Sequence, residues 1–333
     1  MSRSKLTQII KWALAASLLY WAISRGQIDW AILSRLFKNP LLLGALFLMV
    51  YIQLFSTFFR WKLLLHSQQI EIPMRDVIKL GMSSQFYQTL GPGTLGSDLA
   101  RGLFIAKYAP DKKVRGLSTV FLDRVMGFFG MLFLGAASFL FSLKHLEAIS
   151  HHLMPALISM GFFLCGSSLL ITIGLLFFPV LINYFGKAPA NSFREKLNNV
   201  SLISRLFEVL KLYSNRRDFV WYGIFISITM HVLSVGAQYL IARTLFGGIA
   251  PLSAAEFFLG ASLGVLTLAM PLAPSGIGVG QVAFSTIFLV LGWPDAAMGG
   301  SLVTAVQVIS ILVNMSGFFF ISAGKKNEKL AKS

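Results

Sequence analysis

The sequence predicts an all-α protein, a polytopic transmembrane helical bundle with about 6–8 spans. Three observations lead to this class: the composition, the recurrence of apolar stretches of bilayer length, and two apolar regions broken by Pro and Gly. Of 333 residues, 56% are hydrophobic and only 13% are charged, whereas soluble domains carry roughly 25% charged residues. The composition therefore excludes a water-soluble globule and a disordered or collagen-like chain, and one cysteine cannot form an intramolecular disulfide framework.

The predicted spans follow from the thickness of the bilayer core, about 30 Å, which needs roughly 20 apolar residues per helical crossing. Such stretches, with few or no charges, lie at about 9–24, 40–59, 117–141, 154–182, 219–242 and 298–322. The first follows Arg3, Lys5 and Lys11 and resembles the start of a signal peptide. Bulky aromatic residues and the lack of a convincing cleavage site indicate instead a retained first helix.

Two regions are less regular than these spans. Residues 74–108 carry several charges around a Pro/Gly break, and residues 255–292 are apolar but interrupted by Pro271, Pro274, Gly276, Gly278 and Gly280. The second region predicts either two short crossings or one re-entrant pair. For residues 74–108, the sequence likewise leaves open whether the segment is re-entrant.

The basic residues predict the orientation. There are 29 Lys and Arg against 13 Asp and Glu, a net charge of +16, which in a membrane protein indicates orientation and contact with anionic lipid rather than nucleic acid. With residues 1–11 in the cytoplasm, the inside segments hold 23 Lys and Arg and the outside segments hold 5. We therefore expect a multi-pass protein of a bacterial-type inner (plasma) membrane with both termini cytoplasmic. The loop 183–218 predicts either an interfacial amphipathic helix or a solvated basic linker.

A short motif occurs once in each irregular region. Residues 90–96 (LGPGTLG) and 272–278 (LAPSGIG) share Leu, a small residue, Pro, two small residues, an aliphatic residue and Gly, at an offset of 182 residues. Corresponding breaks in two halves indicate an inverted repeat with its site between the repeats, within one integral domain over 1–333 whose halves are about 1–150 and 151–333. Chance similarity or ordinary helix ends are the alternative.

A break at membrane depth is tolerated only beside protein or a water-filled cavity. Its glycines allow close approach of a ligand, and a helix that restarts presents N–H groups to an anion such as a lipid phosphate. Ser97 or Asp98 is expected to cap such a helix over 98–107.

Four charged residues stand in or beside these apolar stretches. Asp98 and Arg101 share a helical face, which allows an ion pair or a joint headgroup contact, and Arg101 is the residue we expect to meet phosphate. Asp123 and Arg124 lie within an otherwise apolar helix, where ionisable residues are functional candidates by default. Asp98 with Arg124 and Arg101 with Asp123 are candidate pairs. A short amphipathic helix with its charges in water is the alternative for Asp98 and Arg101.

Other polar residues are assigned structural roles. We expect Arg60 and Lys62 to anchor the second span at the interface. His231 with Gln238 and Gln307 with Asn314 are each seven residues apart, a spacing that places them on one helix face for hydrogen bonds between helices. No metal site, nucleotide motif or catalytic triad is recognisable, so we expect no cofactor, and enzyme chemistry stays open.

With these residues set out, the chain resembles the flippase-like family that includes the transmembrane region of lysylphosphatidylglycerol synthase and related inner-membrane proteins. The likeness is carried by residues 92–101 (PGTLGSDLAR), by Asp123-Arg124 and by residues 274–281 (PSGIGVGQ). It implies a lipid-handling module in which Asp98, Arg101, Asp123 and Arg124 are site residues. Gln281 stands where members often carry an acidic residue, which argues against a charge-dependent role there. The related two-part synthases also carry an aminoacyl-transferase domain, for which this chain leaves no room.

These observations favour a protein that binds an anionic phospholipid or a polyprenyl-phosphate-linked lipid and moves it between leaflets. The candidate binding residues are Pro92, Gly93, Gly96, Asp98, Arg101, Asp123, Arg124, Pro274, Gly276 and Gly278. Alternatives are a membrane transferase or hydrolase acting on a lipid headgroup, with Asp98 or Asp123 as acid/base, and a noncatalytic accessory subunit with a partner from an envelope-polymer pathway. The oligomeric state is not set by the sequence.

Overall fold

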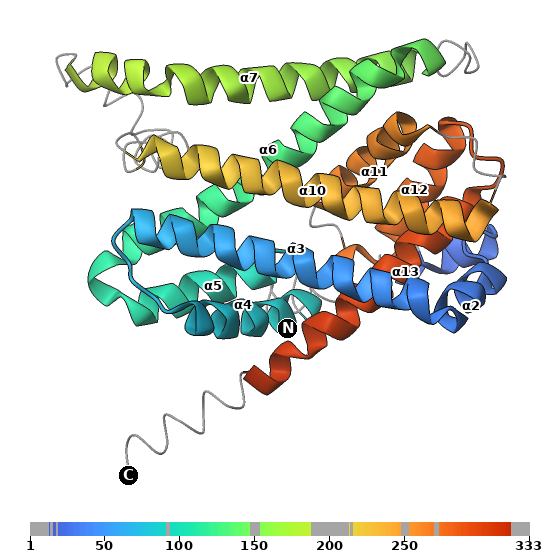
Figure 1. Cartoon of the computed structure of the whole chain (residues 1–333), viewed down its shortest axis with the longest axis horizontal. Coiled ribbons are helices and arrows are strands. Elements are labelled where there is room, and N and C mark those ends of the chain that lie inside the picture. Colours follow the sequence, from blue (N-terminus) through green and yellow to red (C-terminus); the bar gives the residue numbers. More distant parts are fainter. Residues whose placement is uncertain are drawn as a thin grey trace.

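The computed structural model describes residues 19–90, 94–146, 154–187, 216–247, 253–269 and 273–320, together with 13, 16, 17 and 213. Within those ranges all regular secondary structure is helical, which confirms the all-α class (Figure 1). The helices are α2 (Trp30–Lys38), α3 (Pro40–Ser67), α4 (Met74–Leu90), α5 (Thr94–Tyr108), α6 (Lys113–Leu146), α7 (Met154–Lys187), α10 (Arg217–Phe246), α11 (Ala254–Ala269), α12 (Val279–Val290) and α13 (Ala296–Met315), with the 3-10 helices η1 (Pro110–Lys112) and η3 (Pro274–Gly276).

Side-chain caps mark where several helices begin. The Asp29 carboxylate accepts a hydrogen bond from the Ala31 N–H at 2.7 Å, and the Asp295 carboxylate accepts one from the Ala297 N–H at 2.8 Å. Asn39 caps α3, and Pro40 follows it at the first helical position. Proline suits that position because its missing N–H would have no helical partner there.

Four helical segments are long and apolar enough to cross a membrane: Pro40–Ser67, Pro110–Leu143, Asp218–Phe246 and Ala296–Phe320. They confirm helices at the predicted spans 40–59, 117–141, 219–242 and 298–322. Shorter apolar helices lie at Ile158–Gly174, Ala254–Ala269 and Val279–Val290. Most of the predicted first span at 9–24 and of the loop 183–218 falls outside the described residues.

The order of helices in the first part of the chain recurs in the second. One long helix, two shorter helices around a break and another long helix form α3 to α6, and the same order forms α10 to α13. Adding the 182-residue offset of the sequence motif to the bounds of α3, α4, α5 and α6 gives 222–249, 256–272, 276–290 and 295–328. These ranges overlap α10, α11, α12 and α13 in turn. The correspondence therefore extends over four helices.

The equivalent helices α3 and α10 lie side by side and run in opposite directions (Figure 1). Two contacts fix the direction: Arg60 Nη1 donates to Ser227 Oγ at 2.5 Å, and Thr57 Oγ1 donates to Met230 Sδ at 3.6 Å. Moving back along α3 by three residues moves the contact forward along α10 by three. We call this line of contact the α3–α10 seam.

The main core lies where α6, α11, α12 and α13 meet. Phe257 and Phe288 stack against Trp293, with ring centroids 6.0 and 4.5 Å from the indole. Glycines allow backbones to approach closely, as is common between membrane helices. A Cβ on Gly300 would lie 1.9 Å from the Gln27 carbonyl oxygen, so this position of α13 accepts only glycine without movement of the backbone.

Candidate functional site

The first Pro/Gly segment separates two helices, as predicted. α4 ends at Leu90 and α5 begins at Thr94, while Pro92 and Gly93 lie outside the described residues. Gly96 and Ser97 are buried in the first turns of α5. The prediction that Ser97 or Asp98 caps this helix is wrong, because the helix starts at Thr94 and both residues lie inside it. Their side chains instead point toward α6, where both accept hydrogen bonds from Arg124.

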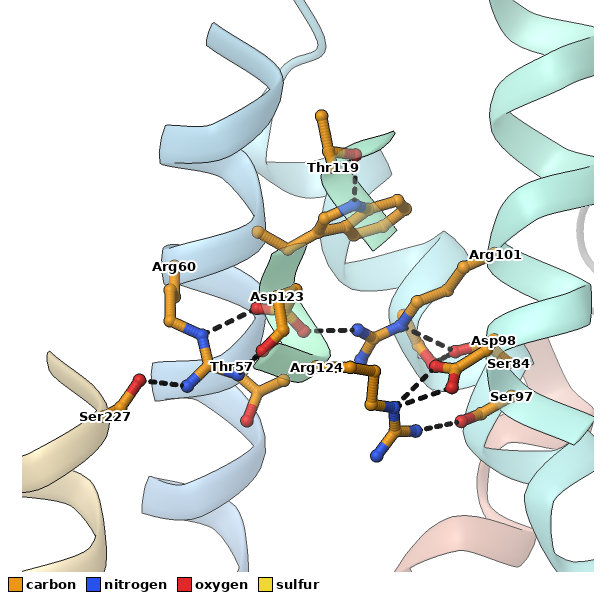
Figure 2. A network of polar contacts seen from close by, with 12 residues as sticks. Thr57, Arg60, Ser84, Ser97, Asp98, Arg101, Thr119, Asp123, Arg124 and Ser227 are labelled. Atoms are coloured by element: carbon orange, nitrogen blue, oxygen red, sulfur yellow. Dashed lines mark hydrogen bonds and ion pairs between the residues drawn. The ribbon is translucent and has the colours of Figure 1, made fainter. Parts of the chain in front are cut away.

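Asp123, on α6, is the centre of a buried ionic network (Figure 2). Its Oδ1 accepts from Arg60 Nε at 2.6 Å and its Oδ2 from Arg101 Nη1 at 3.0 Å. Arg60 Nη2 also donates to the Asp123 carbonyl oxygen at 3.1 Å. The three side chains are only 2–4% exposed. Three helices, α3, α5 and α6, are thus joined through one carboxylate.

Arg101 is held on its other sides by aromatic rings and a hydroxyl. Its guanidinium carbon lies 5.2 Å from the Trp61 ring centroid and 5.9 Å from that of Phe58, distances within the range of cation–π attraction. Its Nε lies 3.4 Å from Ser84 Oγ. Trp61 is fixed in turn by a hydrogen bond from its Nε1 to Thr119 Oγ1 at 3.0 Å.

A second ion pair lies next to this network and is more open. Arg124 Nε donates to both oxygens of Asp98, at 2.8 and 2.7 Å, and Arg124 Nη2 donates to Ser97 Oγ at 3.0 Å. The side chains of Arg124 and Asp98 are 42% and 21% exposed. Figure 2 shows Asp98 and Ser97 on α5 facing Arg124 on α6. The site therefore has a sealed part at Asp123 and an accessible part at Asp98.

Both predicted pairs are confirmed, since Asp98 binds Arg124 and Arg101 binds Asp123. The water-facing alternative for Arg101 is wrong, because that side chain is 2% exposed. The assignment of Arg60 as an interface anchor is also wrong: it is 3% exposed and binds Asp123. No signal in the sequence pointed to Arg60, because the two predicted pairs already balance two arginines against two carboxylates.

The second Pro/Gly segment is held by amides instead of charges. Ser275, Gly276 and Gly278 have φ values of 51°, 70° and 81°, a region that glycine enters without the steric cost of a side chain. Among these residues Gly276 and Gly278 are buried. The side chain of Pro274 lies outside the described residues.

Two glutamines close this second segment. Gln281 Oε1 accepts from the Gly278 N–H at 2.7 Å, and Gln281 Nε2 donates to Gln307 Oε1 at 2.7 Å. Gln307 Nε2 then donates to the Gly276 carbonyl oxygen at 3.1 Å. The predicted interhelical role of Gln307 is confirmed, as is that of His231, whose Nε2 lies 2.9 Å from the Gly127 carbonyl oxygen.

The two segments lie in neighbouring parts of the bundle, because α4 contacts both η3 and α13. Among the described residues, the hydrogen bonds of the glutamines and those of the arginines form two separate groups. Two surface hollows lie elsewhere, one along α10 and the other between α3 and α10. Within the described ranges, no three His, Cys, Asp or Glu residues are grouped as metal ligands would be.

The long apolar helices and their internal ion pairs define a multi-pass helical membrane protein. The chain matches the family model described as the lysylphosphatidylglycerol synthase TM region over residues 8–316. It belongs to this family, which confirms the resemblance inferred from the motifs and supports a lipid-related role in the membrane. No curated protein and no solved structure matches the chain.

Proposed function

We propose that this protein binds a lipid with an anionic headgroup, a phospholipid or a polyprenyl-phosphate-linked lipid, and moves it between the leaflets of a bacterial-type inner membrane. One observation carries the proposal: the arginines of the network outnumber its carboxylates. Among the residues that the structure describes, the ion pairs of Arg60, Arg101 and Arg124 are made with Asp98 and Asp123. Three cations against two anions leave one positive charge in excess.

A single excess charge is significant inside a membrane. A bare charge at the bilayer centre costs at least about 2.5–3.5 kcal/mol on insertion scales. A phosphate paired with the excess arginine would remove that cost for the arginine and for the phosphate. Arginine suits the task, because its guanidinium stays charged and donates two parallel hydrogen bonds to a phosphate. Asp98 and Asp123 would hold the arginines in place between successive lipids.

The broken helices supply the rest of the proposed passage. Pro92, Gly93 and Gly96 precede the turn of α5 that carries Asp98 and Arg101, and Pro274, Gly276 and Gly278 form the corresponding break in the second half. Arranged as an inverted repeat with both termini in the cytoplasm, the two breaks would approach the site from opposite faces. The antiparallel seam of α3 and α10 supports this arrangement.

The proposal requires the network to open. Arg101 is sealed between α3, α4 and α6, whereas Arg124 is partly exposed. A phosphate would therefore meet Arg124 first, displacing Asp98, and would reach Arg101 only after α5 moves away from α6. The position of α5 relative to α6 would therefore distinguish the closed state from the open state.

The test is transbilayer movement of a labelled anionic phospholipid in proteoliposomes that contain the purified protein. For Arg101→Ala combined with Arg124→Ala, we expect movement to slow by roughly 70-fold, the factor that corresponds to about 2.5 kcal/mol of lost charge compensation. Arg243→Ala is the matched control, because Arg243 is exposed near the other end of α10 and contacts Tyr239, away from the arginine network. Unchanged movement in the double variant, at equal reconstitution, would contradict the proposal.

The same experiment separates lipid movement from headgroup chemistry. Mass spectrometry of the recovered lipid should show intact headgroups after movement. A changed headgroup would instead support the alternative of a membrane transferase or hydrolase.

A further inference from the structure

A groove runs along the exposed face of α10 and reaches the α3–α10 seam at its apolar end, where Phe55 and Phe59 of α3 also line it. It consists of two adjoining hollows of about 500 and 390 Å³ that share Phe225. The first is lined by Asp218, Trp221 and Tyr222, and the second by apolar residues of both helices that include Phe59, Met230 and Leu233. One end of the groove is therefore polar and aromatic, and the remainder is largely apolar.

The length of the groove corresponds to one leaflet. Asp218 and Leu233 are fifteen residues apart on α10, which at 1.5 Å per residue is about 22 Å. Asp218 is the second residue of α10, at the end of the candidate span Asp218–Phe246, and Trp221 with Tyr222 are the residue types that favour the membrane interface. The groove thus extends from headgroup depth toward the bilayer centre, the path of one hydrocarbon chain.

The charges at the polar end select the headgroup. Asp218 is exposed and makes no ion pair with a side chain that the structure describes. Trp221 and Tyr222, 42% and 63% exposed, present ring surfaces beside it, and a carboxylate next to aromatic faces is a favourable environment for an ammonium group. Arg216 is exposed two residues earlier. Among the side chains that the structure describes at this end, one anion, two rings and one cation are the complement of a zwitterion.

We propose that this groove is a lipid site distinct from the arginine network, which holds one zwitterionic phospholipid with an ammonium headgroup. The ammonium lies on Asp218, Trp221 and Tyr222, the phosphate meets Arg216, and one chain occupies the apolar hollow along Phe59 and Met230. Thr57 and Met230 separate this hollow from Arg60 and Ser227 on the inner side of the seam. The lipid therefore stays bound on the surface of the helical bundle, and its binding does not depend on translocation.

The experiment uses the full-length protein in nanodiscs with equal amounts of phosphatidylethanolamine and phosphatidylglycerol that carry the same chains. Native mass spectrometry then measures which lipid is retained when the surrounding bilayer is removed. We expect the protein to retain phosphatidylethanolamine in preference, and Asp218→Asn to reduce that preference about tenfold, toward parity. Asp111→Asn, which removes an exposed acid from η1, is the matched control and should leave the preference unchanged.

A second variant tests the chain position. Thr229→Trp fills the apolar hollow with a ring at an exposed position of α10, so it should reduce retention of both lipids without altering their ratio. Equal retention of the two lipids by the unmodified protein, or an effect of Asp218→Asn no larger than that of Asp111→Asn, would overturn the inference. Loss of transport in the arginine variants with phosphatidylethanolamine still retained would leave it standing.

Discussion

At the scale of single residues, the sharing of Asp123 by two arginines governs the energetics of the site. Arg60 and Arg101 each use one of its oxygens, and all three side chains are almost fully removed from solvent. Removing one member of a buried pair leaves an uncompensated charge, which costs more than the pair itself contributes. Asp98 and Arg124 are partly exposed and are subject to solvent screening.

Asp123→Asn should therefore destabilise the protein far more than Asp98→Asn. We expect a loss of about 3–5 kcal/mol for the buried carboxylate and about 0–1 kcal/mol for the exposed one. Thermal unfolding of the purified variants in detergent, followed by intrinsic fluorescence, measures the difference. Equal unfolding temperatures for the two variants would show that the Asp123 network contributes little to the fold.

The pairs at this site were predictable from sequence, whereas the third arginine was not. Charged residues in apolar surroundings need partners, and this applies to Asp98, Arg101, Asp123 and Arg124. Arg60 lies seven residues before the end of α3, a depth of about 10 Å from which an arginine can reach either the interface or the interior. Only the position of α3 against α6 and α10 decides between them, and that position depends on tertiary packing.

At the scale of helices, the two broken segments have the same outline and different chemistry. The first is followed by a helix that carries charges across to α6, whereas the second is closed by Gln281 and Gln307. Proline and glycine predicted both breaks, because these residues interrupt helices in any surroundings. The start of α5 at Thr94 was missed by four residues, since no residue in that stretch marks the first turn uniquely.

Glycine substitutions test whether the helix backbones pack closely at the positions where the structure shows it. Gly300→Ala would place a Cβ 1.9 Å from the Gln27 carbonyl oxygen, whereas a Cβ on Gly44 has nothing within 4 Å. We expect Gly300→Ala to lower the unfolding temperature and the yield of monodisperse protein, and Gly44→Ala to leave both unchanged or slightly improved. Size-exclusion chromatography and thermal unfolding measure the two effects. A stable, monodisperse Gly300→Ala variant would mean that α13 and the segment before α2 are not packed as described.

At the scale of the whole molecule, α3 and α10 bring the two halves together in opposite directions. The contacts of Arg60 with Ser227 and of Thr57 with Met230 are diagnostic together, because parallel helices with the first contact would bring Thr57 to Ile224 instead. The repeated motif predicted an equivalence of the two halves, but seven positions could not specify which helices meet. Long-range pairing of this kind depends on tertiary contacts that leave no local pattern in the sequence.

A cysteine pair tests the direction of the seam. In a Cys165→Ala background, Thr57→Cys with Met230→Cys should form a disulfide or a short bismaleimide cross-link in membranes. Thr57→Cys with Ile224→Cys, the pair that parallel helices with the Arg60–Ser227 contact would bring together, should form no disulfide. Cross-linking of the control pair, or its absence in the test pair, would contradict the antiparallel arrangement.

Labelling from each side of the membrane tests the proposed inverted repeat. In the same background, single cysteines at Thr94 and Ile277 mark the two breaks. An impermeant maleimide should reach one position from the cytoplasmic side and the other from the opposite side. Reaction of both from one side alone would leave the inverted arrangement without support.

The α3–α10 seam also has a mechanical consequence. Because α6 also packs against α10 and α11, tilting of the two halves about this seam would be coupled to movement of α6 over α11. Such coupled tilting would let a headgroup pass between the leaflets without a continuous aqueous pore. The membrane would therefore remain a permeability barrier throughout the cycle.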